Sequence, residues 1–455
     1  MKAAVARNQA SRIPLCCLVR AEQKVMTVFK FNRTMPATMH PEKRTNIIAV
    51  AASTRFLQWG IIGLIIPVTN LIRLSKGLGL AELGFSAAIT AGVVVVLELP
   101  TGILADRIGR KRTYLLSLAF QAAAYGSLLF ASGFMAVSAA FALYGVSRAL
   151  SSGSLEALLI DRYIESHGDA RLHRLMSVSN AADTLGLALG SVAGGFIPGV
   201  WSTLFPLANR YHGNLIAMLM LLSLLWLLVM LAAPREQAMK RADTRLGAFL
   251  SESLAFVRSS PALIAMFAIA VAWGLCFSAI ETYWQPRVAG LVGVTGNAGP
   301  DRLNGFLSAG YFLAALAGSL AITPLMEKSR VGVAPLLMAL RLLTAAFIVT
   351  LAVQTSPGGF AVLYLSMFFW NGMASPPEAT MLNRLLPADK RASMLSAVSL
   401  AVQLGGLIGS VVFGFIAGSY GIRSAWFIAA GVLAASALLY PVAAVRHGSA
   451  LTRHT

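Results

Sequence analysis

Ionisable side chains lie inside several long apolar stretches of the sequence, among them Glu98, Arg148, Asp183 and Glu281. A charge within a lipid bilayer is costly, so such residues are candidates for function if these stretches cross a membrane. Proton coupling requires a carboxylate whose pKa is raised by burial and lowered by a nearby cation. Adjacent stretches could bring Asp183 and Arg148 together, so we predict this pair as the proton-coupling site, with Glu98 as second choice. We interpret Glu281, near the outer end of its stretch, as a solvated residue without such a role.

Residues for enzymatic or metal chemistry are scarce in these stretches. The six histidines fall in loops or tails, at positions 40, 167, 173, 212, 447 and 454. Cys16 and Cys17 are neighbours near the N-terminus, and Cys276 lies alone in an apolar run. No spacing indicates a disulfide framework or a metal site. We therefore predict no metal, no cofactor and no enzymatic activity.

The composition is that of a membrane protein. Hydrophobic residues make up 57% of the chain and charged residues 12%, about half the charged share of an ordinary soluble domain. The net charge of +19 does not indicate nucleic-acid binding, because the basic residues occur in short bursts between apolar runs. A helix needs roughly 20 apolar residues to cross a bilayer. Twelve runs qualify, at about 50–71, 83–105, 112–132, 136–161, 175–198, 213–233, 262–285, 303–325, 333–353, 360–384, 392–418 and 422–445.

The positions of lysine and arginine predict how the chain is oriented. With both termini in the cytoplasm, the inner connections are basic, as in Arg107–Arg112, whereas the outer ones carry few basic residues, Arg73 among them. We predict a multi-pass protein of the cytoplasmic (inner) membrane. The expected parts are a disordered cytoplasmic tail, a six-helix half, a cytoplasmic linker, a second six-helix half and a short cytoplasmic tail, at 1–45, 46–233, 234–261, 262–445 and 446–455.

The two halves repeat one another in sequence. The matching pairs, each with the first-half copy named first, are Trp59-Gly60 and Trp273-Gly274, Gly84-Phe85 and Gly305-Phe306, Glu156 and Glu378, Gly190-Ser191-Val192 and Gly409-Ser410-Val411, and Gly195-Phe196 and Gly414-Phe415. Matches in this order, each six segments apart, indicate duplication. Small residues four apart allow helices to pack closely, which predicts helix packing at Gly186, Gly190, Gly194, Gly195, Gly405 and Gly409. We predict Arg174 and Arg391 as partners of Glu156 and Glu378.

The connection after the second apolar run carries the most specific motif. It reads Gly102-Ile103-Leu104-Ala105-Asp106-Arg107-Ile108-Gly109-Arg110-Lys111 and resembles the signature loop of the major facilitator superfamily. Gly109 permits a sharp turn, and the basic residues suit the anionic lipids of the inner leaflet. In that family the aspartate and arginines form a latch that holds one conformation and breaks in the other. The resemblance implies this role for Asp106, Arg107 and Arg110.

The resemblance also implies an all-α fold of two pseudo-symmetric six-helix bundles. Segments 1, 4, 7 and 10 would line a central cavity for a small-molecule substrate, in a protein that acts as a monomer. The cavity residues this implies are Gln58, Trp59, Asn70, Arg148, Trp273, Tyr283, Trp284, Trp370 and Asn371; the aromatic ones could instead be packing or interfacial residues. The ninth segment would be peripheral, so we expect Arg341 to extend toward the membrane surface.

The glycine-rich fifth segment is similar to a motif of drug:proton antiporters, although Ser191 stands where that motif has proline. Together with Glu98–Gly102, which looks like efflux members of the family, it favours proton-coupled efflux of a small amphiphilic molecule. Proton-coupled uptake of a metabolite is the alternative. An integral membrane enzyme or scaffold would need an intramembrane catalytic or metal cluster, which the sequence does not supply.

Overall fold

The computed structural model describes residues 46–168, 171–234, 255–258, 260–293, 299–328, 332–386 and 391–444, except the side chains of residues 99, 106, 327, 328, 392 and 393. The regular elements of these residues are helices, and no strand occurs among them. The tails predicted at 1–45 and 446–455, and most of the linker predicted at 234–261, lie outside the described residues.

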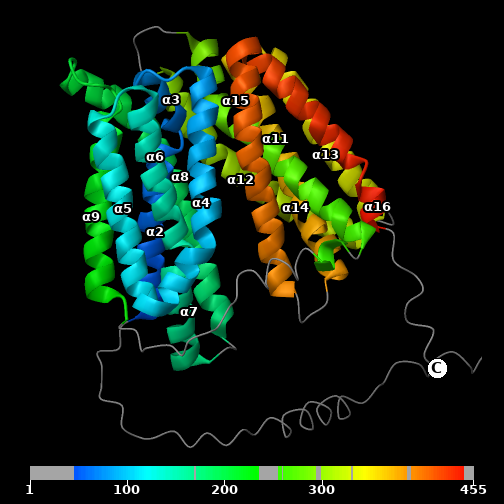
Figure 1. The fold of residues 1–455 in the computed structure, drawn as a ribbon, viewed down its shortest axis with the longest axis horizontal. Helices are drawn as coiled ribbons and strands as arrows, with labels where there is room; N and C mark the ends of the chain where they lie inside the picture. The colour runs from blue at the N-terminus through cyan, green and yellow to red at the C-terminus, as the bar shows by residue number, and fades with distance from the viewer. Residues whose placement is uncertain are drawn as a thin grey trace, which may run out of the picture. The chain divides into compact units, whose positions relative to one another are not determined.

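The helices fall into two sets, which Figure 1 shows side by side, blue to green and green to red. The first set is α2 (Ile47–Ile65), α3 (Thr69–Ser75), α4 (Leu80–Ile108), α5 (Arg110–Phe130), α6 (Gly133–Ser151), α7 (Ser154–His167), α8 (Leu172–Leu204) and α9 (His212–Ala232). The second set is α11 (Pro261–Val292), α12 (Gly299–Lys328), α13 (Val333–Val353), α14 (Pro357–Leu385), α15 (Arg391–Ala437) and α16 (Tyr440–Ala444). We call these sets the first and the second half.

The count of membrane spans depends on two of these helices. Ten helical stretches of the described residues are long and apolar enough to cross a membrane. The last one, Met394–Ala444, turns back at Gly421, where φ is 82°, and so contains two spans. The twelfth is α14, whose 29 residues are long enough to span although Asn371 and the stretch Pro376–Glu378 make it more polar. The prediction of twelve spans in two halves is therefore confirmed.

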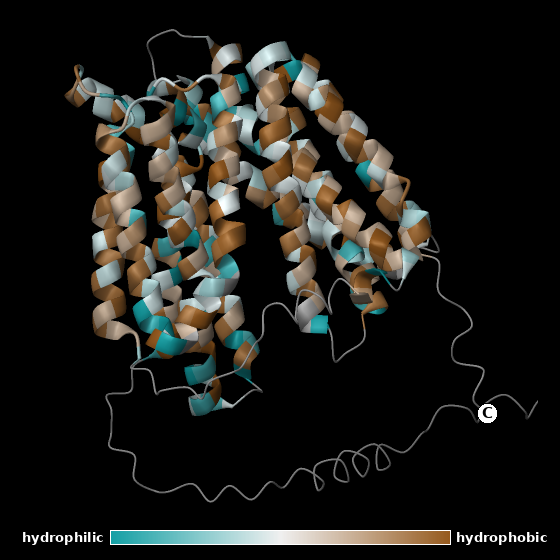
Figure 2. Ribbon diagram, in the orientation of Figure 1, coloured by the Kyte–Doolittle hydropathy of each residue, from teal (hydrophilic) through white to brown (hydrophobic). Residues whose placement is uncertain are grey.

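The outer surfaces of the helices are apolar. The buried share of the residues ranges from 22% to 56% among the candidate spans, so much of their apolar surface faces outward. Figure 2 shows the brown of hydrophobic residues along the helices, with more teal at α7 and near the loops. Exposed side chains such as Val96, Leu185 and Phe415 suit contact with lipid chains rather than water.

Glycines allow two helix pairs to touch through their backbones. A Cβ on Gly190 of α8 would lie 2.3 Å from the carbonyl oxygen of Gly60 in α2. In the second half, a Cβ on Gly405 of α15 would lie 2.1 Å from the carbonyl oxygen of Val271 in α11. The same pairing of helices thus recurs in each half, since α8 and α15 are the fifth helices of their repeats.

Glycines also mark the two places where the halves cross. A Cβ on Gly84 of α4 would lie 2.4 Å from Cα of Gly414 in α15. A Cβ on Gly195 of α8 would lie 2.8 Å from Cα of Gly305 in α12. These two crossings hold the halves together without interlocking side chains at the point of closest approach, a geometry in which one half can tilt against the other.

The two ends of the helix bundle differ in charge. One end, which we call the basic face, carries the turn between α4 and α5 and the end of α7. There Gly109 has φ 98°, Arg110 Nη1 donates to Asp161 Oδ2 at 2.6 Å, and Lys111 Nζ donates to the carbonyl oxygen of Ala233 at 2.7 Å. The other end, with the connections after α3 and α8, we call the opposite face. The side chain of Asp106 lies outside the described residues.

Candidate functional site

A cavity of about 510 Å³ lies between the two halves. Helices α2, α3, α4 and α6 line it from the first half, and α11, α12, α14 and α15 line it from the second. Its volume falls within the range of roughly 300–1,000 Å³ that is typical of small-molecule sites. No group of three or more His, Cys, Asp or Glu side chains in the described part of the chain is placed to hold a metal ion.

Four of the predicted cavity residues line this cavity: Trp59, Asn70, Arg148 and Trp284. The other predicted residues lie elsewhere. Trp273 and Asn371 border a separate small pocket within the second half, and Gln58, Tyr283 and Trp370 line neither pocket. These three make contacts within the helix bundle: Gln58 accepts a hydrogen bond from Tyr114, Tyr283 donates to the carbonyl oxygen of Leu80, and the Trp370 ring meets Phe369 edge-on.

Of the residues that the structure describes, three charged side chains line the cavity: Arg73, Arg148 and Glu281. Glu281 is the one acidic residue among these described lining residues, and the charges of both arginines act on its carboxylate. Neither Glu281 nor Arg148 forms a direct side-chain ion pair with a described residue, and both are exposed within the cavity. The cavity therefore holds an excess of positive charge whenever Glu281 is ionised.

Arg73 is held firmly against the first-half wall. Its side chain is 5% exposed, and its guanidinium lies 3.7 Å from the ring centroid of Phe141. Arg73 Nη1 donates to Asn70 Oδ1 at 2.9 Å, but its buried Nε has no hydrogen-bond partner among the described residues. One donor of this guanidinium is therefore unsatisfied in a place where unpaired polar groups are costly.

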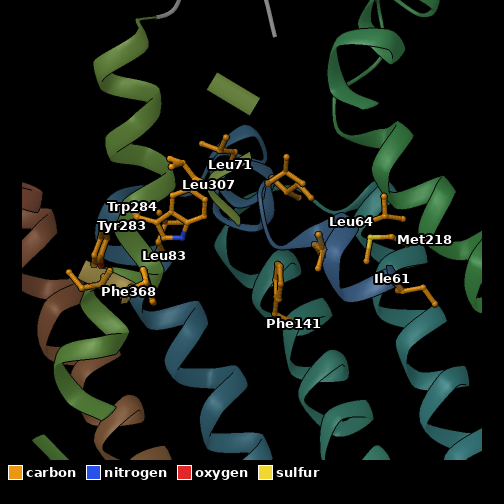
Figure 3. Close-up of a cluster of buried hydrophobic side chains, with 14 of the residues drawn as sticks. Ile61, Leu64, Leu71, Leu83, Phe141, Met218, Tyr283, Trp284, Leu307 and Phe368 are labelled. Carbon is orange, nitrogen blue, oxygen red and sulfur yellow. The ribbon is translucent and has the colours of Figure 1, made fainter. Parts of the chain in front are cut away.

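Aromatic side chains form the second-half wall. The rings of Trp284 and Tyr364 stack with centroids 5.1 Å apart, and Phe368 contacts both Tyr364 and Tyr311. Figure 3 shows Trp284 and Phe368 on this side and Phe141 on a helix of the first half. The cavity thus combines a wall of closely packed aromatic side chains, of which Tyr311 is partly exposed, with a small number of charged groups, as ligand sites commonly do.

Hydrogen bonds join the halves at the end of the cavity nearest the opposite face. Gln285 Oε1 accepts from the backbone N–H of Asn70 at 2.8 Å, and Gln285 Nε2 donates to the carbonyl oxygen of Ile66. Farther out, Arg210 forms an ion pair with Asp301, whose carboxylate also accepts from Tyr211 at 3.2 Å. These contacts hold the halves together at the opposite face.

The predicted pairing of Asp183 with Arg148 is wrong. Asp183 is paired with Arg55 of α2, whose Nη1 also lies 2.8 Å from Glu156 Oε2. Arg148 points instead into the cavity, away from this cluster. Their positions along the sequence do not specify the face of the helix on which each side chain lies, and that face decides the partner.

The predictions for Glu156, Glu378 and Arg341 are also wrong. Glu156 pairs with Arg55 rather than Arg174, and Glu378 pairs with Arg341 rather than Arg391. Arg341 does not extend to the membrane surface: it is 4% exposed and lies 4.4 Å from the ring centroid of Trp273. It also donates to Tyr440 and to Asn371, so four groups surround the guanidinium. A buried charge persists here because it is fully partnered.

Glu98 lies next to the cavity without lining it. Its Oε2 accepts a hydrogen bond of 3.0 Å from Gln403, a residue of the cavity wall on the other half. Glu98 is therefore linked to the cavity through one side chain.

The sequence interpretation missed Glu281 and Arg73 as site residues. Arg73 was expected in an outer connection, but the chain bends after α2 and the short helix α3 turns Arg73 into the cavity. A signal for Glu281 was available, because Gly274, Ser278, Glu281 and Gln285 recur at helical spacing and all line the cavity.

The chain is similar in sequence to a known family of membrane transporters. The family description "Major Facilitator Superfamily" matches residues 48–300 and 293–453. A relative named "Uncharacterized MFS-type transporter YxaM", from Bacillus subtilis (strain 168), is 21% identical over 386 residues, which cover 84% of this chain and 92% of the relative.

Two solved structures share the fold. The nucleoside transporter NupG has a TM-score of 0.72 at 15% identity, covering 88% of this chain and 99% of that one. A bacterial homolog to the human lysosomal transporter Spinster, in an inward-facing and occupied conformation, has a TM-score of 0.70 at 13% identity, covering 89% and 97%.

Proposed function

The chain belongs to the major facilitator superfamily, and on this premise we propose that it couples proton movement to the transport of a small amphiphilic molecule. It is a membrane transporter that works by alternating access, and it is not an enzyme. The observation that carries the proposal of proton coupling is Glu281, a carboxylate exposed inside the cavity without a direct ion pair among the described residues. Such a group can exchange a proton with whatever solution the cavity faces.

We propose that the halves tilt about their two glycine crossings. The hydrogen bonds around Asn70 and the Arg210–Asp301 ion pair favour a conformation closed at the opposite face. On tilting, these contacts would part and the basic face would close. The loop residues Asp106, Arg107 and Arg110 would then form the latch that their family motif implies.

The sequence supports the cytoplasmic membrane as the location, with both termini in the cytoplasm and the basic face inside. Anionic inner-leaflet lipids would contact the basic residues of that face. We propose a monomer as the working unit, since the cavity is complete within one chain.

Export is the direction that the sequence motifs favour, through Glu98–Gly102 and the glycines of α8. The cavity supports uptake as a second candidate, because of its excess of arginine. When Glu281 is ionised it offsets part of the charge of Arg73 and Arg148; when it takes up a proton, both arginines become free for an anion. A proton and an anion would then bind together, which is the behaviour of a symporter.

One experiment tests coupling and direction together. Cells with and without the protein are exposed to a panel of radiolabelled amphiphilic compounds, each with and without a protonophore. Higher accumulation in cells that lack the protein indicates export, and higher accumulation in cells that have it indicates uptake. Loss of either difference with protonophore establishes proton coupling.

The Glu281→Gln variant tests the residue itself. In proteoliposomes it should lose accumulation driven by a proton gradient but keep exchange of labelled for unlabelled substrate, because exchange needs no net proton movement. Glu165→Gln is the matched control, since Glu165 is exposed on α7 and is not among the residues that line the cavity. Gradient-driven accumulation that is unchanged in Glu281→Gln would remove this residue from proton coupling.

A further inference from the structure

We infer that the substrate is an aromatic organic anion whose acidic group is held by Arg73 and Arg148. The inference rests on the proposed function only in taking this cavity as the transport site. It adds the chemical class of the substrate, which neither the family nor the motifs specify.

The charge of the cavity requires a counter-charge. Its lining includes two guanidinium groups and one carboxylate, and no further acidic side chain among the described residues. Even with Glu281 ionised, one positive charge is left without compensation within a membrane-embedded site. Since an uncompensated charge in such surroundings is costly, the site favours a ligand that brings a negative charge.

Arg73 is already fixed in a geometry suited to an anion. Its contacts with Phe141 and Asn70 hold the guanidinium in place, and Asn70 is itself fixed by Gln285 of the other half. The buried Nε still lacks a hydrogen-bond partner among the described residues. A carboxylate or phosphate oxygen would satisfy this donor, because guanidinium groups bind such oxygens through two parallel hydrogen bonds.

Arg148 completes the site from α6, the same helix that carries Phe141. Its side chain is exposed within the cavity and makes no direct side-chain ion pair with a described residue. The charges of Arg148 and Arg73 both act on Glu281, so the acidic group of a substrate would compete with Glu281 for the same two partners. A neutral Glu281 would leave both arginines to the substrate.

The rest of the ligand would lie against the aromatic wall. Tyr311 is partly exposed in this wall, and Trp284, Tyr364 and Phe368, each no more than 5% exposed, form a packed aromatic cluster with it. Flat aromatic groups gain both buried area and ring contacts on such a surface. A cation would also be attracted to these rings, but it would be repelled by the two arginines. The combination therefore selects an aromatic acid over the corresponding amine.

The test compares binding of matched compounds to the full chain purified in detergent. The probes are indole-3-acetate, 4-phenylbutyrate and 1-naphthyl phosphate, with the neutral amide or alcohol of each skeleton and the amine tryptamine. Binding is measured by isothermal titration calorimetry, because the indole and naphthyl probes fluoresce themselves and the chain contains seven tryptophans. At least one acid should bind about 10-fold more tightly than its neutral counterpart, the scale of one charge-assisted hydrogen bond, and tryptamine should bind most weakly.

Variants then assign the effect to residues. Arg148→Gln should lower the affinity for the preferred acid by about 10-fold and leave its neutral counterpart unchanged. Glu281→Gln should raise the affinity for the acid, because the competing carboxylate is gone. Arg423→Gln, a change on the opposite face outside the cavity lining, is the control. Arg73→Lys is included with Arg73→Gln, since it keeps the charge if the buried position does not tolerate glutamine.

The inference is overturned if no acid outranks its neutral counterpart, or if tryptamine binds most tightly. It is also overturned if Arg148→Gln weakens acid and neutral compound equally. These results are separate from the test of proton coupling. Acids can rank first even if Glu281→Gln transports normally, and proton coupling can hold even if the acids do not rank first.

Discussion

The ion pair between Arg210 and Asp301 joins the two halves at the opposite face, and removing one partner should shift the protein toward the alternate conformation. The Asp301 side chain is 1% exposed, whereas that of Arg210 is 36% exposed. Arg210→Gln leaves a buried carboxylate with Tyr211 as its remaining hydrogen-bond donor among the described residues. Breaking a buried ion pair in this way costs about 3–5 kcal/mol.

Because Arg210 is partly exposed, we expect a cost below this range. We take about 2–3 kcal/mol, which corresponds to about a 30- to 150-fold increase in the population open at the opposite face. Asp301→Asn should have a smaller effect. It leaves an arginine that can reach solvent, as in a surface pair worth about 1 kcal/mol or less, or about a fivefold change. Arg210→Gln should therefore have the larger effect, because the partner that it leaves behind is the buried one.

The assay measures how fast a cavity cysteine reacts from the opposite face. Thr69→Cys places the reporter in the cavity lining, in a chain whose three natural cysteines, Cys16, Cys17 and Cys276, are replaced. A membrane-impermeant maleimide is added at the opposite face, and the reaction rate follows the open population. Arg423→Gln is again the control. The reasoning is refuted if Asp301→Asn increases the rate as much as Arg210→Gln, or if neither exceeds the control.

Three further predictions concern the scaffold. Gly190→Ala should destabilise the protein by about 1–3 kcal/mol and lower its thermal midpoint in detergent, because the added Cβ meets the backbone of the neighbouring helix. Gly126→Ala, where an added Cβ meets nothing within 4 Å, should leave the midpoint unchanged. Arg341→Gln should cost about 3–5 kcal/mol through the unpaired Glu378, and the double variant with Glu378→Gln should regain part of this in a double-mutant cycle. Asp183→Asn should lower the thermal midpoint. It should still transport substrate, and that transport should still be sensitive to a protonophore, since Asp183 does not line the cavity.

Hydropathy was sufficient to predict the number of spans, because each span must satisfy its backbone within its own helix. The number of apolar runs long enough to cross the membrane then gives the number of crossings almost directly. The two stretches that a simple count handles badly, α14 and the turn at Gly421, are those where polar residues or an uninterrupted apolar run hide a boundary. The scan for apolar runs nevertheless predicted both, as the runs at 360–384, 392–418 and 422–445.

The charged residues were harder to place, because rise per residue gives the depth of a side chain but not the face of the helix on which it lies. Asp183 and Arg148 were predicted as partners from depth in adjacent segments alone, yet one contacts Arg55 and the other lines the cavity. Arg73 was assigned to a connection because hydropathy does not show that α2 ends early and that α3 folds inward. Glu281 could have been found from the helical spacing of its polar neighbours.

The repeat explains why the scaffold was easier to predict than the chemistry. Glycine contacts recur between equivalent helices of the two halves, since backbone packing depends on small residues at fixed spacing. The charges do not recur in this way. Glu156 and Glu378 are equivalent in sequence, but their arginines come from α2 and α13, the first helix of one half and the third of the other. Duplication therefore gives two similar bundles, while the arginines that divide the cavity into a charged and an aromatic side belong to the first half alone. We therefore propose that this asymmetry, rather than the shared fold, determines which molecule the cavity accepts.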